Sequence, residues 1–165
     1  AILGTDENPS KIYHITLNNS SSIAPALTTG FTNPVTVTAA TYGYGLTSSV
    51  IQTNNMYVYF GINNGNASGG SILRVKVFDT GLTSPQITFT TTDLITPSPS
   101  LYVYNNALID PLNKYLYFSC NSGSSTGYHR VIKVHIEQIT GTTYNFKYYG
   151  ESSSSTTFRK LEGML

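Results

Sequence analysis

The sequence predicts an all-β protein built as an array of repeats, and three observations indicate it. Residues 50–60 recur without a gap as residues 108–118, with the apolar strand positions matched at an offset of 58 residues. Val, Ile, Thr, Tyr and Phe, which suit a pleated and partly buried surface, are abundant. Only 17 of the 165 residues are charged, and no window has the i, i+3, i+4, i+7 apolar pattern of a helix.

The repeat divides the chain into units of 58 residues, which we interpret as one array. These are a partial first unit at residues 1–41, a second unit at 42–99, a third unit at 100–157 and the start of a further unit at 158–165. Ala1 aligns with Val58, in mid-repeat. We therefore expect the array to leave unpaired sheet edges, which are templates for association with another chain.

Four short strands are expected in each complete unit. The recurring block supplies two strands joined by a turn, at Asp110 and Pro111 in the third unit. A loop rich in Gly, Asn and Ser follows, and then a strand with period-two alternation. Each unit closes with another β-prone run; these runs are residues 34–38, 86–90 and 143–149.

The alternation predicts which side chains are buried. After each loop, one strand face is apolar, with Tyr13, Ile15, Leu17, Leu73, Val75, Val77, Ile132, Val134 and Ile136. The opposite face is expected to be more solvated, with His14, Thr16, Arg74, Lys76, Lys133 and His135. Residues 57–60 and 115–118 are apolar on both faces, so we expect both of these strands to be covered on both sides.

Stacked four-stranded sheets around an axis would produce this pattern, so the sequence favours β-propeller blades. A β-sandwich is the main alternative and a β-solenoid is another. Closed propellers have about four to eight blades, and three repeats fall below that range. We therefore expect an incomplete ring, or a ring or stack completed by further blades or further copies of the chain.

The polar composition predicts an extracellular or cell-surface glycoprotein. Ser and Thr number 19 and 23. Asn18, Asn19 and Asn66 stand in Asn-x-Ser sequons within expected loops, where glycans can be attached. Cys120 is the only cysteine; it is interpreted as a buried hydrophobic residue, with an intermolecular disulfide as the alternative.

Several function classes find little support in the sequence. A net charge of +1 with scattered basic residues argues against nucleic-acid binding, and no apolar run approaches the length of a membrane span. Asp6 and Glu7 are neighbours in a loop, and Asp110 suits a turn. We therefore predict no catalytic residues, no metal site and no cofactor. Five tyrosines are candidate partner-binding aromatics: Tyr102, Tyr104, Tyr128, Tyr148 and Tyr149.

The third unit carries a family resemblance. Residues 107–111, followed by 115–118, a loop and 131–134, resemble the repeat of extracellular β-propeller-like arrays in Ser/Thr/Asn-rich protist surface proteins, and more loosely YVTN-type blades. Gln52 and Thr53 depart from the Asp-Pro pair of this motif. The resemblance implies an adhesive or matrix role, with self-association or with carbohydrate or cell-surface protein partners. The alternative is a glycan-active enzyme, a glycosidase or lyase, on a β-propeller.

Overall fold

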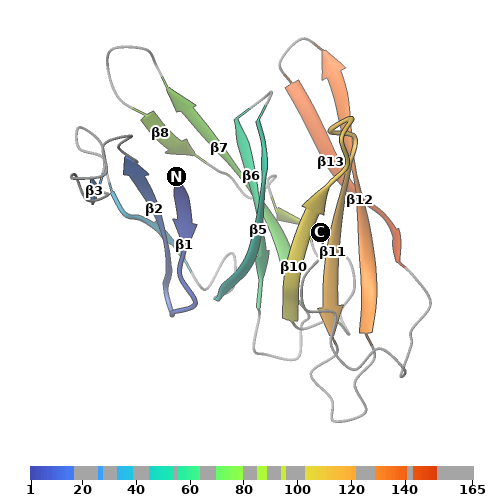
Figure 1. Ribbon diagram of the computed structural model, residues 1–165, viewed down its shortest axis with the longest axis horizontal. Coiled ribbons are helices and arrows are strands. Elements are labelled where there is room, and N and C mark those ends of the chain that lie inside the picture. The colour runs from blue at the N-terminus through green and yellow to red at the C-terminus, as the bar shows by residue number, and fades with distance from the viewer. Residues whose placement is uncertain are drawn as a thin grey trace.

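The chain folds into three antiparallel sheets that stand side by side (Figure 1). The computed structural model describes residues 1–16, 26–27, 33–38, 45–53, 56–63, 70–79, 85–88, 94–95, 103–121, 129–140 and 143–151. These residues contain no helix, which confirms the all-β class. The described strands close into neither a ring nor a barrel, so the propeller arrangement stays a prediction.

None of the described ranges holds a helix that is long and apolar enough to cross a membrane.

The first sheet is built on a hairpin of β1 (Ile2–Gly4) and β2 (Ser10–Thr16). Two short strands, β3 (Ala26–Leu27) and β4 (Val35–Val37), pair with opposite ends of β2. Among the described strands, β1 pairs with β2 alone. The other side of β1 is therefore an open edge in the part of the chain that the structure describes.

The second sheet lies between the other two. Its strands β5 (Leu46–Gln52), β6 (Tyr57–Ile62) and β7 (Ser71–Asp79) pair in sequence order. Two shorter strands, β8 (Pro85–Thr88) and β9 (Leu94–Ile95), pair with opposite ends of β7.

The third sheet is the most regular. Its strands β10 (Val103–Ile109), β11 (Tyr115–Asn121), β12 (His129–Thr140) and β13 (Thr143–Glu151) each pair with the next. The sequence repeat is also visible in the pairing, because the pair Val50–Tyr59 of the second sheet has its counterpart in Leu108–Tyr117 of the third. Each first strand, β5 and β10, carries one register shift at the matching place.

The closing strands differ from the sequence-based prediction. Residues 34–38 and 86–90 are predicted as equivalent, but β4 pairs with the start of β2 whereas β8 pairs with the end of β7. The equivalent of β4 is β9, and that of β8 is β3. The fourth strand is thus split into two pieces in the first two sheets and is continuous in the third. The sequence does not predict this split, because strand propensity does not determine which end of a partner strand a segment joins.

Two apolar clusters hold the three sheets together. The cluster between the first and second sheets contains Ile12, Val37, Leu46, Val58, Phe60, Ile62, Leu73, Val75 and Val77. The cluster between the second and third sheets contains Tyr57, Tyr59, Ile72, Tyr104, Leu116, Phe118, Cys120, Ile132, Val134 and Ile136. The predicted apolar faces of β7 and β12 are therefore confirmed.

A glycine marks the close approach of neighbouring sheets. A Cβ at Gly4 in β1 would lie 2.8 Å from Leu46 and 2.9 Å from Phe60 in the second sheet. A Cβ at Gly61 in β6 would collide with Tyr104 in the third sheet. Leu46 and Tyr104 are themselves 58 residues apart, so the same contact occurs at both interfaces.

Two predictions of burial are wrong at the outer sheets. Strand β6 is buried along its whole length, but in β11 Tyr115 and Tyr117 are only half-buried. In β2, Tyr13 and Ile15 are half-buried, and the fully buried side chains, Ser10 and Ile12, lie on the other face. Both differences have one cause: among the described strands, no fourth sheet packs on the outer face of the first or the third sheet.

Candidate interaction surfaces

Most of the predicted site residues fall outside the described residues. These are Asn18, Asn19, Asn66, Tyr102 and Tyr128. Tyr148 and Tyr149 belong to β13, but their side chains lie outside what the structure describes. The glycosylation of the three asparagines and the partner-binding role of these four tyrosines stay predictions.

Tyr104 is placed inside the protein. Its side chain is 0% exposed, and its ring meets that of Phe118 edge to face at 5.7 Å between centroids. Its hydroxyl donates a hydrogen bond of 3.3 Å to the carbonyl oxygen of Gly70. The ring therefore packs between the second and third sheets and is not displayed to solvent.

Cys120 is a free thiol in the same core. Its side chain is 1% exposed, and Sγ lies 3.4 Å from the carbonyl oxygen of Arg130 on the neighbouring strand. At this depth the thiol packs as a small hydrophobic group. The intermolecular disulfide stays a prediction that would require the sheet to open.

Asp110 closes the turn between β10 and β11. One carboxylate oxygen, Oδ1, accepts hydrogen bonds from the backbone N–H of Lys114 at 2.6 Å and of Tyr115 at 2.7 Å. The backbone carbonyl of Asp110 accepts a third, from Asn113 at 2.9 Å. The Asp-Pro pair thus acts in turn formation, as the sequence suggests.

Removing this carboxylate is expected to destabilise the third sheet. For Asp110→Ala we expect the free energy of unfolding to fall by about 1–2 kcal/mol, because two backbone donors lose a charged acceptor. Urea unfolding would measure the change. Leu112→Ala, at a position 72% exposed in the same turn, is the control and is expected to change little. Equal effects of the two substitutions would contradict this role.

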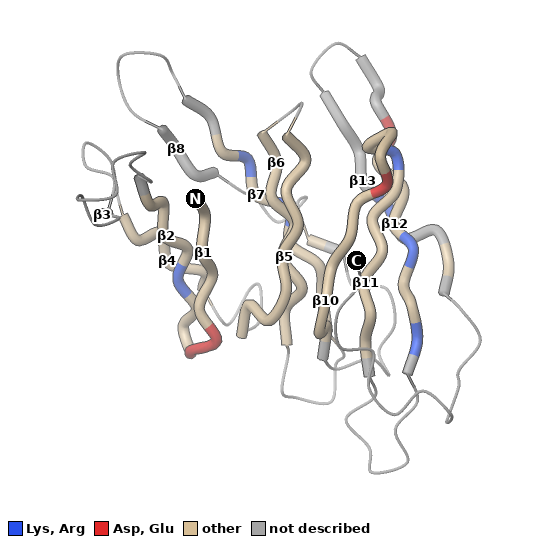
Figure 2. Tube along the Cα trace, viewed as in Figure 1, with Lys and Arg blue, Asp and Glu red and all other residues tan. Residues whose placement is uncertain are grey.

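Acidic residues gather at the turn between β1 and β2 (Figure 2). Glu7 accepts a hydrogen bond of 3.0 Å from the Thr5 hydroxyl and forms an ion pair of 3.2 Å with Lys11. The hydrogen bond from Thr5, and then that from Lys11, lower the pKa of the Glu7 carboxyl below 4.5. Burial acts weakly in the opposite direction.

The lowered pKa gives a pH prediction. At pH values above the pKa that Glu7 has in the unfolded chain, its ionised carboxylate contributes to the stability of the folded protein. This contribution is lost as the pH falls through the lower pKa that Glu7 has in the folded protein. We expect an NMR titration to show a Glu7 pKa below 4.5. Thr5→Val and Lys11→Met are each expected to raise that pKa, because each removes a side chain that lowers it. An unchanged pKa in Thr5→Val would contradict the assignment.

The outer face of the third sheet carries an aromatic and basic cluster. The Lys133 ammonium lies 3.9 Å from the ring centroid of Tyr115 and 5.9 Å from that of Tyr117. The His135 ring stacks on Tyr115 with 5.0 Å between centroids. We call these four residues the tyrosine face; all four are half-buried. Such contacts between cations and aromatic faces are attractive.

The same cluster occurs in the second sheet, where it is covered. Arg74 lies 5.0 Å and Lys76 5.8 Å from the ring centroid of Tyr57. Tyr57 and Tyr59 correspond to the two tyrosines of the tyrosine face, and both are buried against the third sheet. The tyrosine face is therefore a sheet-packing surface that no described sheet covers.

The outer face of the first sheet is the counterpart of the tyrosine face. Leu3 is 51% exposed, and its neighbours Tyr13 and Ile15 are half-buried. By their place in the repeat, these residues correspond to Phe60, Leu73 and Val75 of the second sheet, which are buried against the first. We call Leu3, Tyr13 and Ile15 the aliphatic face.

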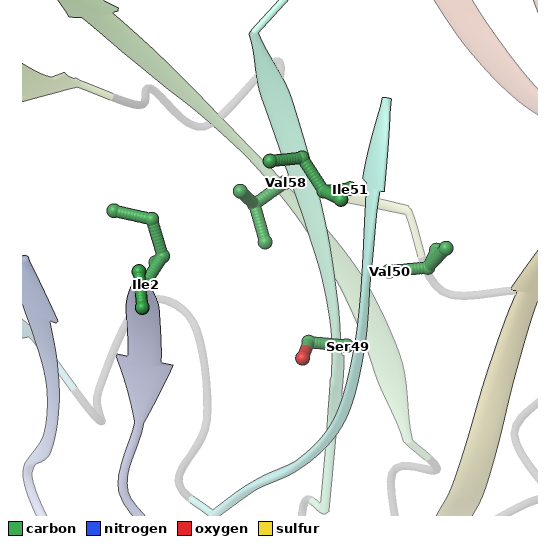
Figure 3. Close-up of a pocket in the computed structure, with 6 residues that line it drawn as sticks. Ile2, Ser49, Val50, Ile51 and Val58 are labelled. Carbon is green, nitrogen blue, oxygen red and sulfur yellow. The ribbon is translucent and has the colours of Figure 1, made fainter. Parts of the chain in front are cut away.

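A hollow of about 420 Å³ lies between the first and second sheets, beside the open edge of β1. Figure 3 shows Ile2 on β1 opposite Ile51 and Val58, with Ser49 beside them. Val50 points toward the third sheet (Figure 3). In the sequence, only the alignment of Ala1 with Val58, which both line the hollow, gives any indication of its location. A hollow between sheets depends on packing between residues that are far apart in the sequence.

No protein-family model, curated protein or solved structure matches the chain.

Proposed function

We propose that the chain is a non-enzymatic structural or adhesive module of an extracellular or cell-surface glycoprotein. It acts by self-association, or by binding protein or carbohydrate partners, through the outer faces of its sheets. The observation that carries the proposal is the tyrosine face, which repeats a buried sheet-packing surface without a described sheet on it. The many Ser and Thr residues and the three sequons support an extracellular site of action.

The partner that fits the tyrosine face best is another sheet of the same repeat. In the second sheet, Tyr57 and Tyr59 share a core with Leu116 and Phe118 of the next sheet. Leu3, Tyr13 and Ile15 hold the same places in the first sheet as residues that pack on a preceding sheet. A second copy can therefore present its aliphatic face to the tyrosine face of the first, as further propeller-type blades would.

A carbohydrate partner is also compatible with this chemistry. Tyrosine rings offer flat apolar area together with a hydroxyl group. Lys133 and His135 add hydrogen-bond donors beside those rings. The same surface is therefore suited to stack on a sugar ring and to bond its hydroxyl or carboxylate groups.

Light scattering across a micromolar concentration range tests self-association. We expect assemblies larger than one chain. We expect the double variant Tyr115→Asp, Tyr117→Asp to shift the population toward monomer, because the two apolar rings are lost from the contact and the new carboxylates would have to leave water. Leu112→Asp, on an exposed turn of the same sheet, is the control. A compact monomer throughout, together with no binding on a glycan array, would overturn the proposal.

The glycan-active enzyme stays a prediction. It requires two carboxylates that converge on one pocket, whereas the hollow beside β1 is lined by Ser49, aliphatic side chains and Ala1. A hydrolysis assay run in parallel with the glycan array separates the two functions, because a binding module leaves the bound glycan intact.

A further inference from the structure

The open edge of β1 is a strand-sized site, and the repeat indicates what fits it. In the second sheet, β6 lies between β5 and β7, and in the third sheet β11 lies between β10 and β12. Strand β1 takes the place of β6 and β11, because it pairs with β2 as they pair with β7 and β12. No described strand takes the place of β5 or β10 beside β1.

The backbone of β1 is oriented to receive a strand. Ala1 and Ile15 exchange two hydrogen bonds, of 2.6 and 2.8 Å, across the β1–β2 pair. Because the bonding groups of an antiparallel strand alternate between its two sides, the peptide groups of Ile2 and Gly4 point away from β2. They face the side on which β5 and β10 lie in the other sheets.

The side chains around the hollow also indicate a strand position beside β1 that no described strand fills. Ile51 in β5 is 45% exposed. Its counterpart in β10 is Ile109, which packs against the core between the second and third sheets, as does Val50 of the second sheet. The residue that would correspond to Val50 in the first sheet belongs to the position beside β1. The hollow lies where that side chain would meet Ile51.

The register of a strand at this position follows from the glycines. Gly4 and Gly61 make matching contacts with the next sheet, so Ile2 corresponds to Tyr59. Tyr59 pairs with Val50 in the second sheet, and the equivalent pair in the third is Leu108–Tyr117. An apolar residue therefore belongs opposite Ile2, and it would point into the hollow on the same side as Ile2.

We propose that the edge of β1 is an acceptor site for an extended polypeptide segment with the residue pattern of β5 and β10. The segment is uncharged, runs antiparallel to β1 and places one apolar side chain in the hollow against Ile51. Main-chain hydrogen bonds to Ile2 and Gly4 provide affinity, and the hollow provides selectivity. This goes beyond the proposed function, since it stands on β1 and β5 and not on the tyrosine face.

A peptide with the sequence of residues 103–109, which form β10 and carry no charged side chain, tests the proposal, with fluorescence anisotropy as the readout. We expect saturable binding to the 165-residue chain. A peptide with Leu108→Asp is expected to bind at least about tenfold more weakly, because its charge would enter an apolar hollow. The protein variant Ile51→Asp should weaken binding of the unchanged peptide by a similar factor. Leu112→Asp is the control on the protein and should bind the peptide normally.

Hydrogen exchange locates the bound peptide. We expect the amide protons of Ile2 and Gly4 to exchange more slowly when the peptide is present, since they become hydrogen-bonded. No saturable binding, equal binding of the Leu108→Asp peptide, or unchanged exchange at Ile2 and Gly4 would each overturn the proposal. None of these outcomes bears on self-association through the tyrosine face, which the Tyr115 and Tyr117 variants test.

A covalent version gives a second, independent measurement. Residues 103–115, which hold β10 and its turn, can be placed directly before Ala1, in the register that they have before Leu116. We expect this extended chain to melt at a higher temperature than the original chain. The same extension with Leu108→Asp is expected to lose most of the gain. An equal gain from both extensions would contradict a specific strand position.

Discussion

Gly61→Ala is expected to lower the free energy of unfolding by about 2–3 kcal/mol, the upper range for overpacking a well-packed core. The added methyl group would collide with the backbone-proximal part of Tyr104 and with the Ser48 hydroxyl. Neither group is the end of a long flexible side chain, so the second and third sheets would have to move apart. Urea unfolding would measure the loss.

Gly150→Ala is the matched control for this prediction. Gly150 also lies in a strand, but a Cβ built on it meets nothing within 4 Å. Alanine costs less conformational entropy than glycine on folding, so we expect Gly150→Ala to be neutral or to stabilise by up to about 0.5 kcal/mol. A Gly61 variant as stable as the Gly150 variant would show that the two sheets do not approach as closely as described.

Tyr104→Ala is expected to have the largest effect of any substitution considered, a loss of about 3–5 kcal/mol. The ring fills the core between two sheets, and its removal leaves a cavity bordered by Phe118. Tyr104→Phe is the matched variant. It keeps the ring and removes the hydroxyl that bonds to Gly70 at 3.3 Å, and it should cost about 0.5–1.5 kcal/mol.

These two Tyr104 variants also separate packing from partner binding. If the ring packs the core, any loss of binding should follow the loss of folded protein, as measured by thermal melting in parallel. A Tyr104→Ala variant that keeps its melting temperature but loses a partner would contradict the buried placement.

The sequence predicted well those features that depend only on residues close together along the chain, such as the buried face of a strand or the position of a turn. The alternation in β7 and β12 identified the buried sides of both strands, because side chains of a strand alternate between two faces. The run from Tyr57 to Phe60 predicted a strand covered on both sides, and β6 is buried throughout. The Asp-Pro pair predicted a turn, and Asp110 makes the bonds that close it.

Predictions failed where the outcome depends on a neighbouring sheet. Tyr117 has the same local pattern as Tyr59, yet it is half-buried because no described sheet covers it. The prediction for Tyr13 failed in the same way: the alternation in β2 places it on a buried face, but it is half-buried because no described sheet covers that face. The role of Gly61 was also invisible, since a glycine in a strand does not reveal which aromatic ring lies opposite it. Such features arise from packing between residues that are far apart in sequence.

The sheets of this protein have two unlike faces, and this gives any stack of them a direction. A tyrosine face that meets an aliphatic face is a heterologous contact, which generates a ring if the rotation closes and a helical filament if it does not. The two ends of such a filament differ. A copy altered only at Tyr115 and Tyr117 would still join one end, and would then stop growth there as a cap. A small fraction of altered copies would therefore shorten filaments made mostly of unaltered chains.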